Sequence, residues 1–184
     1  MGRKGFTLVE MLLVFVVLGL VVAFAAPRID VQKYRVNSAM QAVGTTLLAA
    51  QRMAVTRQHN IIVAFDAGGA SLRVVDDTNN NGLADPGEHQ RAIPLDRIVF
   101  GLAGATPYQT FTSAISFTKK LGALPALTFH RDGSASEAGA LYLTTPRAVS
   151  DPRYSGDTRV IVIDRATARV SWYRASPPNW QRGF

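Results

Sequence analysis

The fold of this chain is decided by one stretch near its start, Lys4 to Ala26, which reads KGFTLVEMLLVFVVLGLVVAFAA. Residues 6–26 within it carry a single charge, on Glu10. As an α-helix this block reaches about 31 Å, enough to cross the hydrocarbon core of a bilayer. Arg3 and Lys4 precede it, and basic residues mark the cytoplasmic side of a membrane segment. We therefore expect one transmembrane helix at residues 6–26, with the bulk of the chain exported.

Glu10 is the informative residue of this block. A carboxylate inside a bilayer costs about 2.5–3.5 kcal/mol by insertion scales, so it is a functional candidate by default. It needs a cationic partner, and the block contains none. A cut between Gly5 and Phe6 would create an α-amine one helical turn away, and in an assembly that amine could face Glu10 of a neighbouring subunit. At about 4 Å and an effective dielectric near 20, such a pair is worth about 4 kcal/mol before desolvation.

The run from Lys4 to Glu10 resembles the class III signal of type IV pilins and type II secretion pseudopilins. The resemblance implies a leader at residues 1–5, cleavage between Gly5 and Phe6 by a prepilin peptidase, methylation of the new Phe6 amine, and a subunit-docking role for Glu10. An ordinary secretory signal is the competing interpretation, with its cleavage site in the alanine-rich end of the block. The block is longer than the apolar core of such a signal, and a signal has no use for an acid near its start.

A second helical pattern follows the block. Apolar residues recur at alternating spacings of four and three, which is the period of an amphipathic helix packing one face on a domain. They are Val36, Met40, Val43, Leu47, Ala50 and Ala54. We expect this amphipathic continuation to cover residues 27–56, with a bend at Pro27, where the resembling family often bends its long helix.

The remainder, residues 57–184, changes to short β-rich runs separated by turn residues. The strands we predict are Ile61–Phe65, Ser71–Val75, Arg91–Leu95, Arg97–Gly101, Leu127–Phe129, Ala140–Leu143, Arg159–Asp164 and Arg169–Tyr173. Asp66–Ala70 is typical of a tight hairpin connection. The expected fold class is α+β and type IV pilin-like: a long N-terminal helix, transmembrane and then amphipathic, packed on an antiparallel β-rich head.

The last sixty residues sharpen the resemblance. The run Leu127–Gly133, a strand at Leu141, Arg159–Asp164 and Ala168–Val170 follow one another as in H-type minor pseudopilins and their pilus relatives. This implies a minor subunit of a type II secretion pseudopilus, anchored in the bacterial inner membrane with a periplasmic head. Its implied partners are the prepilin peptidase, other major and minor pseudopilins, and membrane lipid. The alternative is a minor type IV pilin for pilus biogenesis or DNA uptake.

Residues 77–88 match the twelve-residue EF-hand calcium loop. Oxygen-bearing groups fall at loop positions one, three, five, seven, nine and twelve, and Gly82 sits at the sharp-turn position. The candidate ligands are Asp77, Asn79, Asn81, Leu83, Asp85 and Glu88. The flanks look like strands rather than helices, and a polar hairpin rich in Asn, Gly and Asp explains the same string. Calcium is the one cofactor that the sequence suggests.

Seven arginines and no lysines lie from Arg147 onward, interleaved with aromatic residues. Such a pattern can bind DNA through phosphates and stacking, and the candidates are Arg165, Arg169 and Arg174. Some pilus members of the resembling family bind DNA through a Gly-Arg-x-Arg element, but here the aligned string, residues 168–171, lacks the glycine and the second arginine. A solvated strand face is the simpler explanation.

Composition argues against catalysis. The chain has no cysteine, which excludes disulfides, thiol chemistry and thiolate metal sites. Its three histidines lie far apart, and no nucleophile elbow, phosphate loop or zincin signature occurs. We expect no enzymatic activity and no small-molecule substrate. The net charge of +7 suits an anionic membrane surface or nucleic acid without choosing between them.

Overall fold

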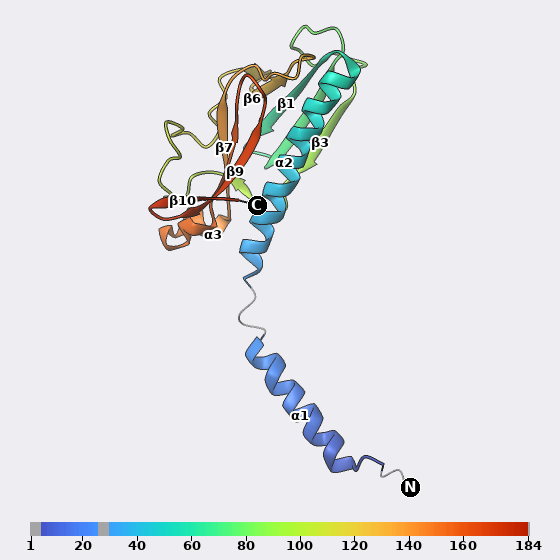
Figure 1. Ribbon diagram of the computed structural model, residues 1–184, viewed down its shortest axis with the longest axis vertical. Coiled ribbons are helices and arrows are strands. Elements are labelled where there is room, and N and C mark those ends of the chain that lie inside the picture. The colour runs from blue at the N-terminus through green and yellow to red at the C-terminus, as the bar shows by residue number, and fades with distance from the viewer. Residues whose placement is uncertain (1–4, 26–29, 184) are drawn as a thin grey trace. The chain divides into compact units, whose positions relative to one another are not determined.

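The computed structural model describes residues 5–25 and 30–183 and divides the chain into two compact units, Met1–Val31 and Gln32–Phe184 (Figure 1). The first four leader residues and the predicted bend at Pro27 lie outside the described residues.

The helix of the first unit, α1 (Leu8–Ala25), is apolar on every side. Its large apolar side chains from Leu8 to Phe24 remain 45–81% exposed. The helix begins at Leu8 rather than at the predicted Phe6, because Thr7 acts as the residue that caps it. Over the described residues, none of the helices combines the length and the apolar character needed to span a membrane.

The predicted amphipathic stripe is confirmed in α2 (Val31–Arg57). All six of its apolar positions are buried, most of them completely. Gly44 lies on the same face, where a Cβ would sit 3.3 Å from the Trp172 ring, so the small residue allows helix and sheet to approach closely. The helix ends at Arg57, one residue beyond the prediction, where Gln58 turns to a left-handed φ of 59°. Arg57 forms an ion pair with Asp76 that ties this end to the head.

Two five-stranded antiparallel sheets make up the described head. The first has the order β3-β2-β1-β6-β5. Its strands are β1 (Asn60–Asp66), β2 (Ser71–Asp77), β3 (Gln90–Pro94), β5 (Lys120–Leu121) and β6 (Leu124–Phe129). The second has the order β10-β9-β8-β7-β4. Its strands are β4 (Val99–Phe100), β7 (Gly139–Thr144), β8 (Arg159–Ile163), β9 (Val170–Ser176) and β10 (Asn179–Arg182).

Every predicted strand is present, and the turn between β1 and β2 is confirmed as a hairpin. The prediction for Arg97–Gly101 was too long: only Val99 and Phe100 pair with β7, because Arg97 takes a left-handed φ of 52° that an extended strand excludes. The sequence analysis missed β5, β10, the short helix α3 (Pro146–Ser150) and the 3₁₀ segment η2 (Pro152–Asp157).

The core joins α2 to both sheets, which stand alongside it in Figure 1. Leu47, Phe65, Phe129 and Ile161 are fully buried there. A smaller cluster lies on the other face of the second sheet, where Tyr142 is buried against side chains of the 101–118 segment and of β9 and β10. The second sheet therefore has one face on the main core and one face covered in part by a loop.

Candidate functional site

Thr7 and Glu10 close a capping box at the start of α1. The Thr7 amide donates to Glu10 Oε2 at 2.7 Å, and the Thr7 hydroxyl donates to the same oxygen at 2.9 Å. In return the Glu10 amide donates to the Thr7 hydroxyl at 3.2 Å. The two side chains thus satisfy backbone groups that the helix start leaves without helical partners.

This second role of Glu10 was missed in the sequence analysis, although Thr-x-x-Glu before an apolar run is its signature. Both side-chain bonds reach Oε2. Within the described residues, Oε1 has no hydrogen-bond donor and is open to a partner from outside the chain. One carboxylate can therefore cap its own helix and receive an amine from another subunit.

Gly5 and Phe6 precede the capping box in irregular, exposed backbone. Phe6 is 82% exposed, and no other group lies within 4 Å of the position of a Cβ on Gly5. Among the described residues, the peptide bond predicted to be cut is therefore exposed.

The 77–88 loop gathers its predicted ligands through hydrogen bonds among themselves. The side-chain amides of Asn79 and Asn81 both donate to Asp85 Oδ2, at 2.8 and 2.7 Å. Asp77 is fully buried and accepts the Asn81 and Gly82 amides. Glu88 accepts the amides of Thr78 and Asp85. The side chains at loop positions three, five and nine therefore converge on one point.

The same loop shows what a metal ion would require. Across residues 5–25 and 30–183, no group of three or more His, Cys, Asp and Glu side chains is placed to hold a metal ion. Oxygens from Asn79 and Asn81 would be needed, and each amide must turn over to present its oxygen in place of its nitrogen. Leu83 would contribute through its carbonyl, and its amide donates to Asn81 Oδ1 at 2.8 Å.

The three candidate DNA-binding arginines do not share one surface. Arg165 lies in the turn between β8 and β9, Arg169 directly before β9, and Arg174 within it, and all three are exposed. Val170 and Trp172 pack on the main core, so Arg174 points to that side by the alternation of a strand. Arg169 instead lines a groove on the opposite face.

Arg159, the strand partner of Arg174, is a buried cation that sequence reasoning did not single out. Its guanidinium donates to Asn37 Oδ1 on α2 at 2.9 Å and to the carbonyls of Gly156 and Thr158. Burial and the nearby Arg174 lower the pKa of Arg159 to about 10. These contacts fasten the start of α2 to the second sheet.

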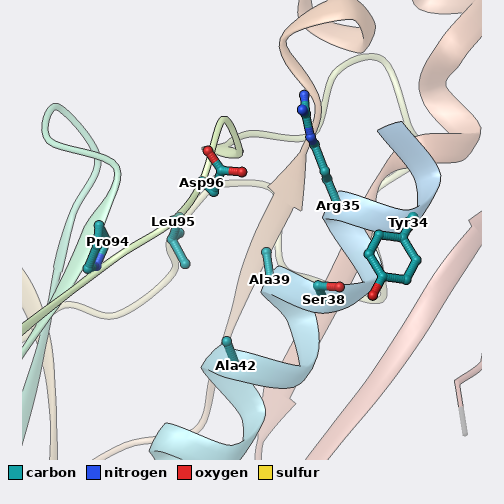
Figure 2. Close-up of a pocket in the computed structure, with 8 residues that line it drawn as sticks. All are labelled: Tyr34, Arg35, Ser38, Ala39, Ala42, Pro94, Leu95 and Asp96. Atoms are coloured by element: carbon teal, nitrogen blue, oxygen red, sulfur yellow. The ribbon is translucent and has the colours of Figure 1, made fainter. Parts of the chain in front are cut away.

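A recess of about 270 Å³ lies between the first turns of α2 and the segment after β3. Figure 2 shows the small side chains of Ser38, Ala39 and Ala42 on its helix side and Pro94, Leu95 and Asp96 opposite them. Its walls are mainly apolar, and its size suits one large apolar side chain.

Two family models match the chain. The prokaryotic N-terminal methylation motif covers residues 1–26, and the type II transport protein GspH covers residues 39–167, more than half of the chain. The pilin-like protein PilA1 of Thermus thermophilus is 30% identical over 89 residues, 48% of this chain and 57% of that relative. The chain thus spans little more than half of that relative's length. The minor pseudopilin EpsH of the Vibrio cholerae type 2 secretion system aligns with a TM-score of 0.48 at 14% identity, over 72% of this chain and 92% of EpsH.

Proposed function

Because this chain belongs to the type II transport protein GspH family and is a pilin-like minor pseudopilin, we propose that it serves in the periplasmic pseudopilus of a type II secretion system. The observation that carries this proposal is the GspH match over residues 39–167 behind a prepilin motif at residues 1–26. The family is one of structural subunits, and we propose no catalytic role for this member.

The N-terminus is proposed to be processed and anchored as the motif implies. A prepilin peptidase cuts between Gly5 and Phe6, and the Phe6 amine is methylated. Residues 6–26 then enter the bacterial inner membrane, with the head of residues 57–184 in the periplasm. The exposure of the Gly5–Phe6 bond and the all-round apolar surface of α1 support this arrangement.

Glu10 is proposed to dock this subunit onto other pseudopilins. Its open Oε1 receives the N-terminal amine of a neighbouring subunit while Oε2 holds the capping box. A pair of this kind fixes the relative direction of the two helices, because it joins the N-terminal amine of one helix to Glu10, one turn into the neighbouring helix. It also removes an isolated carboxylate from the membrane interior.

The capping box allows the docking role to be tested separately from the helix start. Glutamine also closes a capping box, so Glu10→Gln keeps the cap and loses the charge, whereas Glu10→Ala loses both. We expect both variants to insert in the membrane and both to lose at least about 90% of co-purification with partner pseudopilins, because an unpaired amine costs more than 1.4 kcal/mol. Normal secretion and normal co-purification in Glu10→Gln would contradict charge-based docking.

The alternative, a minor type IV pilin that captures DNA through Arg165, Arg169 and Arg174, is supported by the similarity to PilA1, a pilin-like protein. Arg169 and Arg174 point to opposite faces of the sheet, which argues against DNA capture, since one duplex surface cannot contact both. A gel-shift titration of the protein at several salt concentrations separates the two proposals. Submicromolar binding with a steep salt slope would favour the pilus role.

We also propose that the 77–88 loop takes calcium weakly, with a dissociation constant near 10⁻³ M, as in extracellular modules. The convergence of Asn79, Asn81 and Asp85 favours it. Asp85→Asn is the suitable variant, because it keeps the shape of the loop, whereas Asp77 is buried and accepts the backbone amides of Asn81 and Gly82. Calorimetry should show calcium heat in the parent protein and none in the variant; equal heats would exclude this site.

A further inference from the structure

A groove of about 720 Å³ opens on the face of the second sheet that α2 does not cover. Val162 on β8 and Ser171 and Tyr173 on β9 form its floor, while Tyr108 and Phe111 of the 101–118 segment form a wall. Neither the processing site nor the calcium loop contributes to it. Its volume falls within the range of ligand-binding pockets, about 300–1,000 Å³.

Two cations border this groove, Arg169 and Arg182, and both are exposed. Among the described residues, neither guanidinium donates a hydrogen bond or forms an ion pair. Arg182 is the strand partner of Tyr173, and Arg169 precedes Tyr173 by four residues. The strand rise of about 3.3 Å per residue therefore places the Cα atoms of the two arginines about 13 Å apart along the strand direction, on neighbouring strands about 5 Å apart and on one face of the sheet.

A third charge, Asp164, lies beside Arg169. Hydrogen bonds from the Thr167 amide and hydroxyl, and to a smaller extent the Arg169 charge, hold the pKa of Asp164 below its usual range. The groove thus has one more positive than negative charge, and its negative charge partly offsets one of the two cations.

The aromatic side chains of the groove are not arranged to stack nucleic-acid bases. Tyr108 and Tyr173 stack on each other with ring centroids 4.5 Å apart, and Trp180 meets Tyr108 edge-on. Each of the two tyrosines thus has one ring face covered by the other, which reduces the open aromatic surface that single-strand binding uses. Two arginines are also few for a phosphate backbone, where tight binders make about 6–10 contacts.

We propose that this groove binds an extended acidic peptide segment of a partner protein, with two carboxylates four residues apart. In an extended chain, side chains at positions i and i+4 point the same way and lie about 13 Å apart, which matches the spacing of Arg169 and Arg182. The side chain at i+2 lies over Val162 and Phe111, so an aliphatic residue fits there. Each arginine offers a carboxylate two parallel donors.

Fluorescence anisotropy with the full chain in detergent micelles tests the proposal. The probe is fluorescein-labelled Glu-Thr-Val-Thr-Glu. One comparison probe is Gln-Thr-Val-Thr-Gln, another has its two glutamates adjacent, and a third is a ten-nucleotide oligothymidine. We expect saturable binding of the first probe and at least about tenfold weaker binding of the other three, the loss of one charge-assisted contact being worth about that factor.

Variants of the chain locate the binding. Arg169→Gln and Arg182→Gln should each weaken the acidic probe about tenfold. Arg174→Gln, on the opposite face, is the matched control and should leave affinity unchanged. Asp164→Asn keeps its turn-closing oxygen but loses the competing charge, so it should tighten binding about two- to threefold. No binding at millimolar protein, tighter binding of oligothymidine, or an affinity unchanged from the parent in both groove variants would overturn the proposal.

Discussion

The helix α1 leaves its apolar side chains exposed, whereas the head buries them. Phe15 in α1 is 70% exposed, whereas Phe65 and Phe129 in the head are fully buried. The head covers its apolar residues with its own sheets and α2, while the described part of α1 leaves its apolar residues for another medium or another molecule to cover. The head thus covers its own apolar residues, whereas those of α1 stay exposed, which agrees with the insertion and assembly proposed for this helix.

The largest expected effect comes from replacing one phenylalanine in each region with alanine. Phe129→Ala should destabilise the head by about 3–5 kcal/mol, because it leaves a cavity in a close-packed core. Phe15→Ala should leave head stability within about 0.5 kcal/mol of the parent. Urea unfolding of the full chain in detergent, followed by tryptophan fluorescence, measures both. A comparable loss in both variants would remove the contrast.

A second test concerns charges, because the head buries the acid of an ion pair whose arginine is half-buried. Asp157 is 1% exposed and accepts hydrogen bonds from Thr145 and from Arg147, with the Arg147 Nε bond at 2.6 Å. Asp157→Ala should cost about 2–3 kcal/mol by leaving these donors without an acceptor. Asp157→Asn keeps part of the network and should cost less. If both variants unfold at the parent's urea midpoint, the network is not structural.

A smaller effect is expected at the start of α1. Thr7→Val removes the capping hydroxyl but keeps the shape of the side chain, at a cost of about 1 kcal/mol to the first helical turn. The head should be unaffected. Amide hydrogen exchange in detergent should show faster exchange only near residues 8–11. Faster exchange in the strands as well would mean that the two regions are coupled.

The smallest effect lies at alkaline pH. Burial, together with the Tyr173 contact, raises the pKa of Tyr108 to about 12. The folded state holds this proton more tightly than the unfolded state. The proton's contribution to the free energy of unfolding is therefore full below pH 10 and is lost as the pH rises to 12. The described part of α1 contains no tyrosine, so the change concerns the head alone. Burial also raises the pKa of Tyr142, so absorbance titration should show late phenols, of which Tyr108→Phe removes one. An unchanged titration in Tyr108→Phe would contradict the assignment.

The helices α1 and α2 could be predicted from the sequence because their signals are local. They are a long apolar block with a single charge for α1 and a strict four-three spacing of apolar residues for α2. The shortest elements were not. β5 has only two residues and takes its conformation from pairing with β6. α3 did leave a local sign, the Thr145 cap followed by Pro146, which went unnoticed.

The candidate sites divide in the same way. The processing motif and the Thr7–Glu10 capping box are contiguous strings, so sequence alone can find them. The acidic-peptide groove cannot be found so, because the 101–118 segment brings Tyr108 onto β9 across 65 residues of chain. The opposed directions of Arg169 and Arg174 follow from their odd separation, but only because β9 extends beyond Tyr173, where the predicted strand ends, to Ser176.

The proposed assembly role of the N-terminal helix requires that a free amine be created beside Glu10, and mass spectrometry of the protein purified from its native membrane tests this most directly. We predict a mature chain that begins at Phe6 and carries one added methyl group on its amine. A chain that begins after Ala26, or one that retains residues 1–5, would contradict the account.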